Sequence, residues 1–266
     1  MPPAYVKPYV KRQKNDAVDA EACWEAVGRP NMRFVAIKSE EQQSVLMLHR
    51  ARDLLIGQRT QTSNALRGHL AELGIIAKQG RGGTDELLAL VEGDEEGLLP
   101  EFARTALLVL ADQLHELRVK INKIEREIHA WHRSNAPSRR LETAPGVGPI
   151  TASAIVATVP DPSCFKSGRQ FAAWLGLTPN ENSTGGKQRL GRITRAGDPY
   201  LRRLLVVGAH AVLRHSGNAK SAPTRWAAEL LGKKPYTVAA VALANKMARV
   251  IWAMMTKGEA FRTAGA

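Results

Sequence analysis

The segment 181-ENSTGGKQRLGRITRAGDPYLRR-203 combines hydroxyl groups, glycines and many basic side chains. Ser183 and Thr184 directly precede Gly185 and Gly186, where the missing side chains let the backbone approach a bulky group closely. The basic residues that follow are Lys187, Arg189, Arg192, Arg195, Arg202 and Arg203. Such side chains pair with phosphate oxygens and stabilise the charge of a phosphoryl-transfer transition state. The composition favours a loop that only binds phosphate, and the alternative is a hydroxyl that attacks phosphorus.

Two carboxylates form a second group with chemical potential. Asp16 and Asp19 lie three residues apart at the start of a helix expected over 16–27, so both face the same side. Joined by further acids, such a pair can hold a divalent metal beside a phosphodiester. Acids in a first turn also interact favourably with the helix dipole without any further role. The pair by itself does not distinguish these two interpretations.

A third pattern, in 141-LETAPGVGPITASAIVATV-159, is typical of two helices joined by a tight turn. Pro145 ends one helix, Gly146 and Gly148 permit the turn, and Pro149 begins the next helix. In a helix–hairpin–helix the backbone N–H groups of this turn bind a phosphate directly. An ordinary turn between packed helices has the same punctuation, but the basic charge of the chain favours phosphate binding.

The charge of the chain indicates a polyanionic partner. Lys and Arg outnumber Asp and Glu by 38 to 25, which gives a net charge of +13 and a pI of about 10.1. The basic residues recur along most of the chain, which favours nucleic acid over a membrane surface. The apolar stretch 237–255 contains Asn245, Lys246 and Arg249, so it is predicted to be a packed helix. The N-terminus has no apolar signal segment, and two distant cysteines are expected to be reduced thiols of a cytosolic protein.

The elements that must position these groups are mostly helices. Ser39 and Gln42 form a capping box for a long helix to about residue 73, and a short helix is expected at 84–92. Further helices are expected at 149–158, 167–175, 199–215, 223–231 and 235–257. A β-type run occupies 33–38, a linker is expected at 134–138, and no strand is expected in the C-terminal part.

The clearest periodicity lies on a helix from about residue 101 to 132. Apolar residues recur there at alternating spacings of three and four, as in a coiled coil. They are Leu107, Leu110, Leu114, Leu117, Ile121, Ile124, Ile128 and Trp131. Such a stripe requires a partner helix, which is either the 39–73 helix or the same helix of a second subunit.

The order of these motifs resembles the DEDD-class transposases of the insertion-sequence one-ten family, most closely its eleven-eleven subgroup. The resemblance covers essentially the whole chain and is carried by four segments: 7–22, 39–74, 143–157 and 174–209. The series S-[ST]-G-G-K…G-D-x-Y-L-R-R in the last segment is the most specific. The resemblance implies a mainly α fold: a remnant of a RuvC (RNase H-like) domain at 1–38, a coiled-coil spacer at 39–136 and an all-helical transposase domain at 137–266, with the helix–hairpin–helix at about 141–159.

The resemblance also implies site residues and partners. Ser183 matches the catalytic serine, with Thr184 as the alternative alignment, and Asp16 and Asp19 match the metal-binding D-x-x-D that holds Mg²⁺. The implied partners are DNA, a structured guide RNA and further copies of the chain in a dimer or tetramer, without a membrane. The implied location is the bacterial cytoplasm, in association with the nucleoid.

One departure from the family bears on activity. The family's other Asp and Glu precede the D-x-x-D on strands, whereas no residue before Asp16 is acidic and Glu21 and Glu25 share its helix. The sequence therefore predicts an N-terminally truncated member with an incomplete metal site. Its function is a DNA transposase and recombinase by resemblance, and the alternative is a non-catalytic nucleic-acid-binding fragment. A purely structural coiled-coil protein would leave the basic C-terminal segment unexplained.

Overall fold

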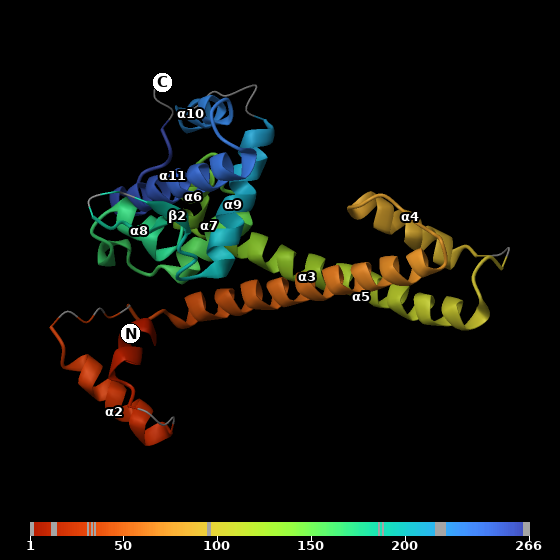
Figure 1. The fold of residues 1–266 in the computed structure, drawn as a ribbon, viewed down its shortest axis with the longest axis horizontal. Coiled ribbons are helices and arrows are strands. Elements are labelled where there is room, and N and C mark those ends of the chain that lie inside the picture. The colour runs from red at the N-terminus through yellow and green to blue at the C-terminus, as the bar shows by residue number, and fades with distance from the viewer. Residues whose placement is uncertain are drawn as a thin grey trace.

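Two helices of more than thirty residues form the longest feature of the structure, a computed structural model (Figure 1). Helices α3 (Glu40–Glu72) and α5 (Glu101–Ser134) run side by side in opposite directions and carry a helical body at one end. The described residues are 3–11, 15–30, 32, 34, 36–94, 97–185, 187, 189–215 and 222–262. They are mainly helical, which confirms the mainly α part of the predicted fold class.

The N-terminal helices form a small separate group. This group contains α1 (Pro3–Val6), the 3₁₀ turn η1 (Lys7–Tyr9) and α2 (Asp16–Val27). Asn15 caps α2 by accepting a hydrogen bond from the backbone N–H of Val18 at 2.8 Å, so the predicted helix begins where expected. The β-type run expected at 33–38 lies partly outside the described residues, and its described residues form no strand. Among the elements that the structure describes, these three pack only on one another.

The coiled-coil stripe of α5 packs on α3 of the same chain. The capping box of α3 is present: Gln42 N donates to Ser39 Oγ at 3.1 Å, and Ser39 N donates to Gln42 Oε1 at 3.0 Å. Leu107 and Leu114 of the stripe are buried in one apolar cluster with Leu66 and Leu70 of α3. Of the two partners considered from sequence, the structure therefore supplies the intramolecular one.

The end of this helical hairpin that lies away from the body is closed by α4 (Arg81–Glu92). Leu87, Leu88 and Val91 of α4 are buried in the same apolar cluster. The helix is longer than the 84–92 segment expected from sequence. It includes Gly82 and Gly83, which the sequence assigned to a looser region because glycine weakens a helix interior.

The prediction of a linker at 134–138 is wrong. After Asn135 the chain forms α6 (Ala136–Glu142), because the Asn135 side chain accepts a hydrogen bond from Ser138 N at 2.9 Å and caps the new helix. Pro137 fits in the first turn, where no backbone N–H is needed. Ser138 is fully buried, and its hydroxyl bonds His132 Nδ1 at 2.7 Å.

The body at the other end is built around α11 (Tyr236–Lys257). It is packed by α6, α8 (Gly168–Trp174), α9 (Pro199–Arg214) and α10 (Ala222–Leu231), while α7 (Pro149–Thr158) joins the body to α3 and α5. A 3₁₀ turn, η2 (Pro162–Cys164), precedes α8. Within the described chain, α11 alone has the length and apolar composition of a membrane span. Its buried residues, from Ala239 to Met254, lie in the core, in agreement with the packed helix predicted.

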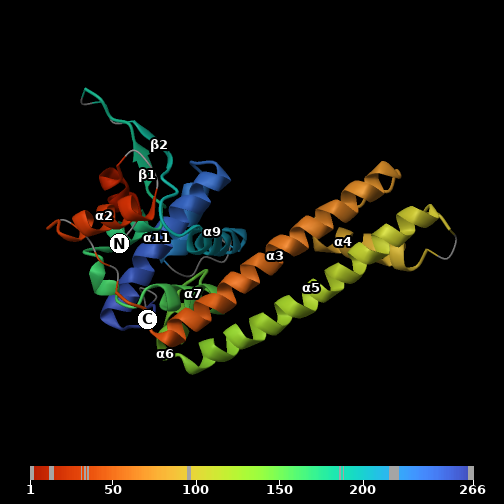
Figure 2. The same ribbon diagram turned by 90° about the horizontal axis from the view of Figure 1, so that it is seen from below.

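One segment of the body corrects the all-helical expectation. Strands β1 (Pro179–Glu181) and β2 (Leu190–Ile193) form an antiparallel β-hairpin, with Pro179 opposite Ile193 and Glu181 opposite Leu190. Figure 2 shows that the hairpin projects away from the helices. Nearly all of its strand residues are exposed, so no alternation of apolar and polar residues marks the strands in the sequence.

Candidate functional site

The base of the β-hairpin is held by two close backbone approaches. A Cβ on Gly176 would lie 2.3 Å from Ala196 O, and a Cβ on Gly197 would lie 1.9 Å from Trp174 O. Both glycines have positive φ, as does Arg195 at 55°, whose N–H donates to Gly176 O at 3.2 Å. The chain on either side of the hairpin is therefore packed backbone to backbone. This packing fixes where the hairpin leaves the body.

Ser183 lies at the outer end of this hairpin, and its hydroxyl is oriented by both sides. Ser183 Oγ donates to Glu181 Oε1 at 2.9 Å and accepts from Arg189 N at 3.2 Å. Thr184 contributes its carbonyl, which accepts from Lys187 N at 3.2 Å around Gly185, whose φ is +58°. In the described chain the Thr184 hydroxyl has no hydrogen-bond partner, and Gly186 lies outside the described residues. The two neighbouring hydroxyls therefore differ: that of Ser183 is held by two hydrogen bonds, and that of Thr184 is not.

Four basic side chains of the hairpin segment have no acidic partner in the described chain. Lys187, Arg189, Arg192 and Arg195 are all exposed, and within the described residues none of them forms an ion pair. Glu181 is the acid next to them on the hairpin, and it is bonded to Ser183. The hairpin therefore presents unneutralised positive charge to solvent, which suits a polyanion.

Arg202 and Arg203, assigned from sequence to nucleic-acid binding, have intramolecular partners. Arg202 Nη1 donates to Leu175 O at 3.0 Å and to Ala196 O at 2.7 Å, which braces the base of the hairpin. Arg203 forms an ion pair with Asp53 of α3, and its guanidinium lies 5.4 Å from the centre of the Tyr200 ring. Their binding of nucleic acid stays a prediction, but both side chains also hold the site in place.

A buried histidine that the sequence did not single out joins α3 to the body. His49 Nδ1 lies 3.0 Å from Tyr200 Oη, and His49 Nε2 lies 3.1 Å from Ser153 Oγ. Burial, followed by the charge of Arg52, lowers the pKa of His49 from 6.5 to about 4. His49 is therefore neutral at pH 7. No local pattern marks it, because its partners are more than a hundred residues away in the chain.

The two glycines of the turn between α6 and α7 have different surroundings. Gly146 has a φ of +78°, and a Cβ there would lie 2.8 Å from Gly208 O and 2.8 Å from Val212 Cγ2 of α9. Gly148 is exposed and precedes the first residue of α7, and a Cβ on it would have no neighbouring atom within 4 Å. Gly146 thus serves the packing of the turn on α9, whereas Gly148 lies at an open helix start.

Asp16 and Asp19 lie in the first turn of α2, as expected. Glu21 of the same helix pairs with Lys11 at 2.5 Å, and Glu25 pairs with Arg29. Among the described residues, no group of three or more His, Cys, Asp or Glu side chains is arranged as a metal site. Among the described elements, α2 packs only on α1 and η1 and has no contact with the β-hairpin, so the structure does not bring Asp16 and Asp19 together with Ser183. Figure 1 shows α2 apart from the helical body.

Comparisons with known proteins match both ends of the chain to transposases. Residues 138–223 match the family described as Transposase IS116/IS110/IS902 family, and residues 2–75 match a DEDD family described as Transposase. A probable family 20 transposase of Pseudomonas aeruginosa is 48% identical over 261 residues, which cover 98% of this chain and 77% of that protein. The transposase for insertion sequence element IS1111A of Coxiella burnetii is 39% identical over 261 residues, covering 98% and 71%. The transposase for IS1328 of Yersinia enterocolitica is 38% identical over 259 residues, covering 97% and 77%.

Proposed function

Because this chain belongs to the IS116/IS110/IS902 family of transposases, we propose that it cuts and joins DNA phosphodiesters with Ser183 as the nucleophile. The observation that carries the proposal is the orientation of the Ser183 hydroxyl between Glu181 and Arg189 N on an exposed basic hairpin. A serine hydroxyl is a weak nucleophile unless an adjacent base takes its proton. Glu181 lies at the distance that such a base requires.

The proposed chemical step is the one that the family resemblance implies. Ser183 Oγ attacks phosphorus while its proton passes to the Glu181 carboxylate. The bond between Oγ and phosphorus forms, the bond from phosphorus to O3′ breaks, and O3′ takes up a proton and leaves as a 3′-hydroxyl. The DNA is then held as a phosphoserine ester, which the 3′-hydroxyl of another strand can attack in strand exchange.

The basic side chains of the hairpin stabilise the charge of this step. Negative charge builds on the non-bridging oxygens as the pentavalent phosphorus forms, and guanidinium groups pair with two such oxygens at once. Lys187, Arg189, Arg192 and Arg195 supply this charge. The open start of α7, next to Gly148, offers backbone N–H groups of its first turn to a neighbouring phosphate.

Asp16 and Asp19 are proposed as two carboxylate ligands of Mg²⁺. They are two of the four acidic ligands that the family resemblance implies, and Mg²⁺ is commonly held by one or two carboxylates together with substrate phosphates and water. When bound, the ion would neutralise charge on the phosphate oxygens. Since α2 packs apart from the hairpin, the proposal requires the two to meet on the DNA, within one chain or between two copies.

The proposal includes the partners implied by the family resemblance. These are DNA, a structured guide RNA and further copies of the chain in a dimer or tetramer. The proposed setting is the bacterial cytoplasm at the nucleoid. The charge of +13 supports nucleic-acid partners, since neutralised phosphates release counterions on binding.

Trapping on nicked DNA with Mg²⁺ present tests the nucleophile. The expected result is a covalent adduct with the wild type and with Thr184→Ala, and its loss in Ser183→Ala. An adduct that survives Ser183→Ala overturns the assignment. Salt-sensitive DNA binding by the wild type without any adduct would instead support the alternative, a nucleic-acid-binding protein without catalysis.

A further inference from the structure

A second basic site lies at the end of the helical hairpin that is remote from the body. A cavity of about 340 Å³ opens where α3, α4 and α5 meet. Each of these helices contributes arginine to its wall: Arg59 and Arg67 from α3, Arg81 from α4 and Arg118 from α5. These residues are up to 59 positions apart in the chain, so no local pattern in the sequence groups them.

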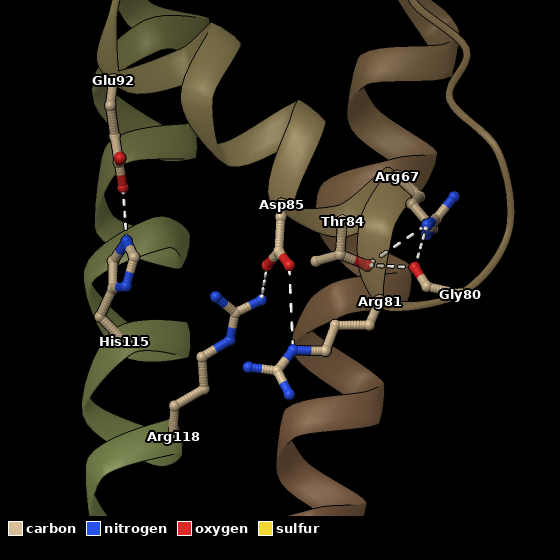
Figure 3. A network of polar contacts seen from close by, with 8 residues as sticks. All are labelled: Arg67, Gly80, Arg81, Thr84, Asp85, Glu92, His115 and Arg118. Carbon is tan, nitrogen blue, oxygen red and sulfur yellow. Dashed lines mark hydrogen bonds and ion pairs between the residues drawn. The ribbon is translucent and has the colours of Figure 1, made fainter.

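In the part of the chain that the structure describes, the four arginines of this cavity have one acidic partner between them, so most of their positive charge is not neutralised. Asp85 is the carboxylate that contacts these arginines: it accepts a hydrogen bond from Arg118 and pairs with Arg81 at 3.8 Å (Figure 3). Arg67 donates to carbonyl oxygens, which do not neutralise its charge. Arg59 has neither an ion pair nor a hydrogen bond within the described chain. Several guanidinium groups around a single carboxylate attract an anion.

Contacts within the chain hold the wall of the cavity in place without a ligand. Arg67 Nη2 donates to Gly80 O at 3.0 Å and to Thr84 Oγ1 at 3.2 Å (Figure 3). It also donates to Lys78 O at 2.8 Å, so one side chain holds the loop against the first turn of α4. A Cβ on Gly83 would lie 1.8 Å from Lys78 O, so the loop can pass this close only because residue 83 is glycine. A fixed wall lowers the entropy cost of binding.

We propose that this cavity binds a phosphodiester group of a nucleic-acid strand. Arginine pairs with phosphate through two parallel hydrogen bonds. The remaining wall is largely amide and hydroxyl groups, including Asn64, Asn122 and Ser63, which donate to phosphate and sugar oxygens. Its volume falls within the roughly 300–1,000 Å³ of ligand sites. The inference rests on the proposed function in that the chain must bind nucleic acid at all.

The position of the cavity defines what such a contact does. Residues 59–67 lie about 30–40 Å along α3 from its first residue at 1.5 Å per residue. A strand held there and at the β-hairpin spans much of the molecule. The cavity therefore adds affinity and orients the bound nucleic acid without touching the reacting phosphate.

The test uses Arg59→Glu, because Arg59 has no described partner whose loss would unfold the chain. Arg50→Glu is the matched control: Arg50 is exposed on α3, nine residues earlier and thus on the opposite side of the helix. Binding of a labelled DNA duplex and of a labelled RNA hairpin with the same number of phosphates is measured by anisotropy over a salt series. Circular dichroism verifies that both variants keep the wild-type helix content.

Arg59→Glu is expected to weaken binding about tenfold and to reduce the salt slope by about 0.9 for a duplex, as for one lost phosphate contact. Arg59→Lys is expected to restore the slope but only part of the affinity, because it lacks the guanidinium fork. An effect on RNA alone assigns the phosphodiester to RNA, and an effect on DNA alone assigns it to DNA. Equal behaviour of Arg59→Glu and Arg50→Glu overturns this inference while leaving the proposed function standing. Failure of the wild type to bind either probe overturns both.

Discussion

At the residue scale, Ser183 differs from Thr184 in having a carboxylate within hydrogen-bonding distance. Glu181 accepts from Ser183 Oγ at 2.9 Å, while Arg189 N, directly before β2, donates to the same oxygen at 3.2 Å. An oriented hydroxyl beside a base is the arrangement that activates serine in covalent catalysis. Glu181 is therefore a catalytic residue of the proposed reaction, although no motif in the sequence pointed to it.

Replacing Glu181 by Gln is expected to slow formation of the covalent DNA adduct by about 10²–10⁴-fold near neutral pH, because an amide cannot take the proton. The rate should recover partly as the pH is raised. Single-turnover trapping across a pH series measures both effects. Glu127→Gln, an exposed acid on α5, is the control and should follow the wild type. A Glu181→Gln variant with the wild-type rate and pH profile would remove Glu181 from the mechanism.

His49 makes stability depend on pH in a defined direction. Its pKa is lowered from 6.5 to about 4 in the folded protein, so the unfolded chain takes up a proton first as the pH falls. The contribution of His49 to stability is complete above about pH 6.5 and is lost progressively towards pH 4. The expected loss is at most about 3 kcal/mol.

Urea unfolding of the wild type and of His49→Gln between pH 7 and pH 4 checks this expectation. The wild-type free energy of unfolding should fall more steeply over that range, because Gln does not titrate. Parallel curves for the two proteins would mean that His49 is protonated in the folded state or does not contribute. Other acids titrate equally in both proteins, so the difference isolates His49.

At the element scale, the apolar stripe of α5 is buried against other helices of the same chain. Leu114 is fully buried among residues of α3 and α4, whereas Leu54 of α3 is 63% exposed. The free energy of the helical hairpin therefore comes from its own apolar contacts. The question of a dimer or tetramer rests on surfaces other than this stripe.

Leu114→Ala is expected to lower the free energy of unfolding by about 2–5 kcal/mol, because it leaves a cavity in a packed cluster. Leu54→Ala should change it by less than about 0.5 kcal/mol. Urea unfolding monitored by circular dichroism gives both values. Equal losses of free energy in Leu114→Ala and Leu54→Ala would contradict the packing of the stripe on α3 of the same chain.

At the scale of the whole molecule, the proposed chemical groups lie on three separate parts. The N-terminal helices carry Asp16 and Asp19, the body carries the β-hairpin with Ser183, and the remote end of α3 and α5 carries the arginine cavity. The N-terminal helices pack only on one another among the described elements. The proposed mechanism therefore requires assembly on nucleic acid to bring the carboxylates to the serine.

Hydrogen exchange provides a test of this arrangement. In the free protein the amides of α2 should exchange much faster than those of α3, because only Ala22 and Ala26 of α2 are buried. Addition of DNA with Mg²⁺ should protect α2 if it docks beside the hairpin. Equal protection of α2 and α3 in the free protein would contradict the separate packing of the N-terminal helices.

The sequence by itself determined most of the helices, the charge and the family. Asn15 and Ser39 begin their helices where predicted, because capping is a local interaction within one turn. The α5 stripe is visible because its period matches a helix face. The family likewise follows from the order of short motifs along the chain, which the matches to known transposases confirm.

Only the tertiary structure decided the surroundings of the chemical groups. The exposed β-hairpin has no alternation of apolar and polar residues that would mark its strands in the sequence. Only the folded hairpin shows that Ser183, and not Thr184, has hydrogen-bond partners for its hydroxyl. The partners of His49 and Arg203, and the arginines around the remote cavity, come from distant segments. A local pattern reports on contacts within a few residues, whereas burial, ion pairing and cavities depend on which distant segments meet. The contacts between distant segments depend on how the whole chain packs.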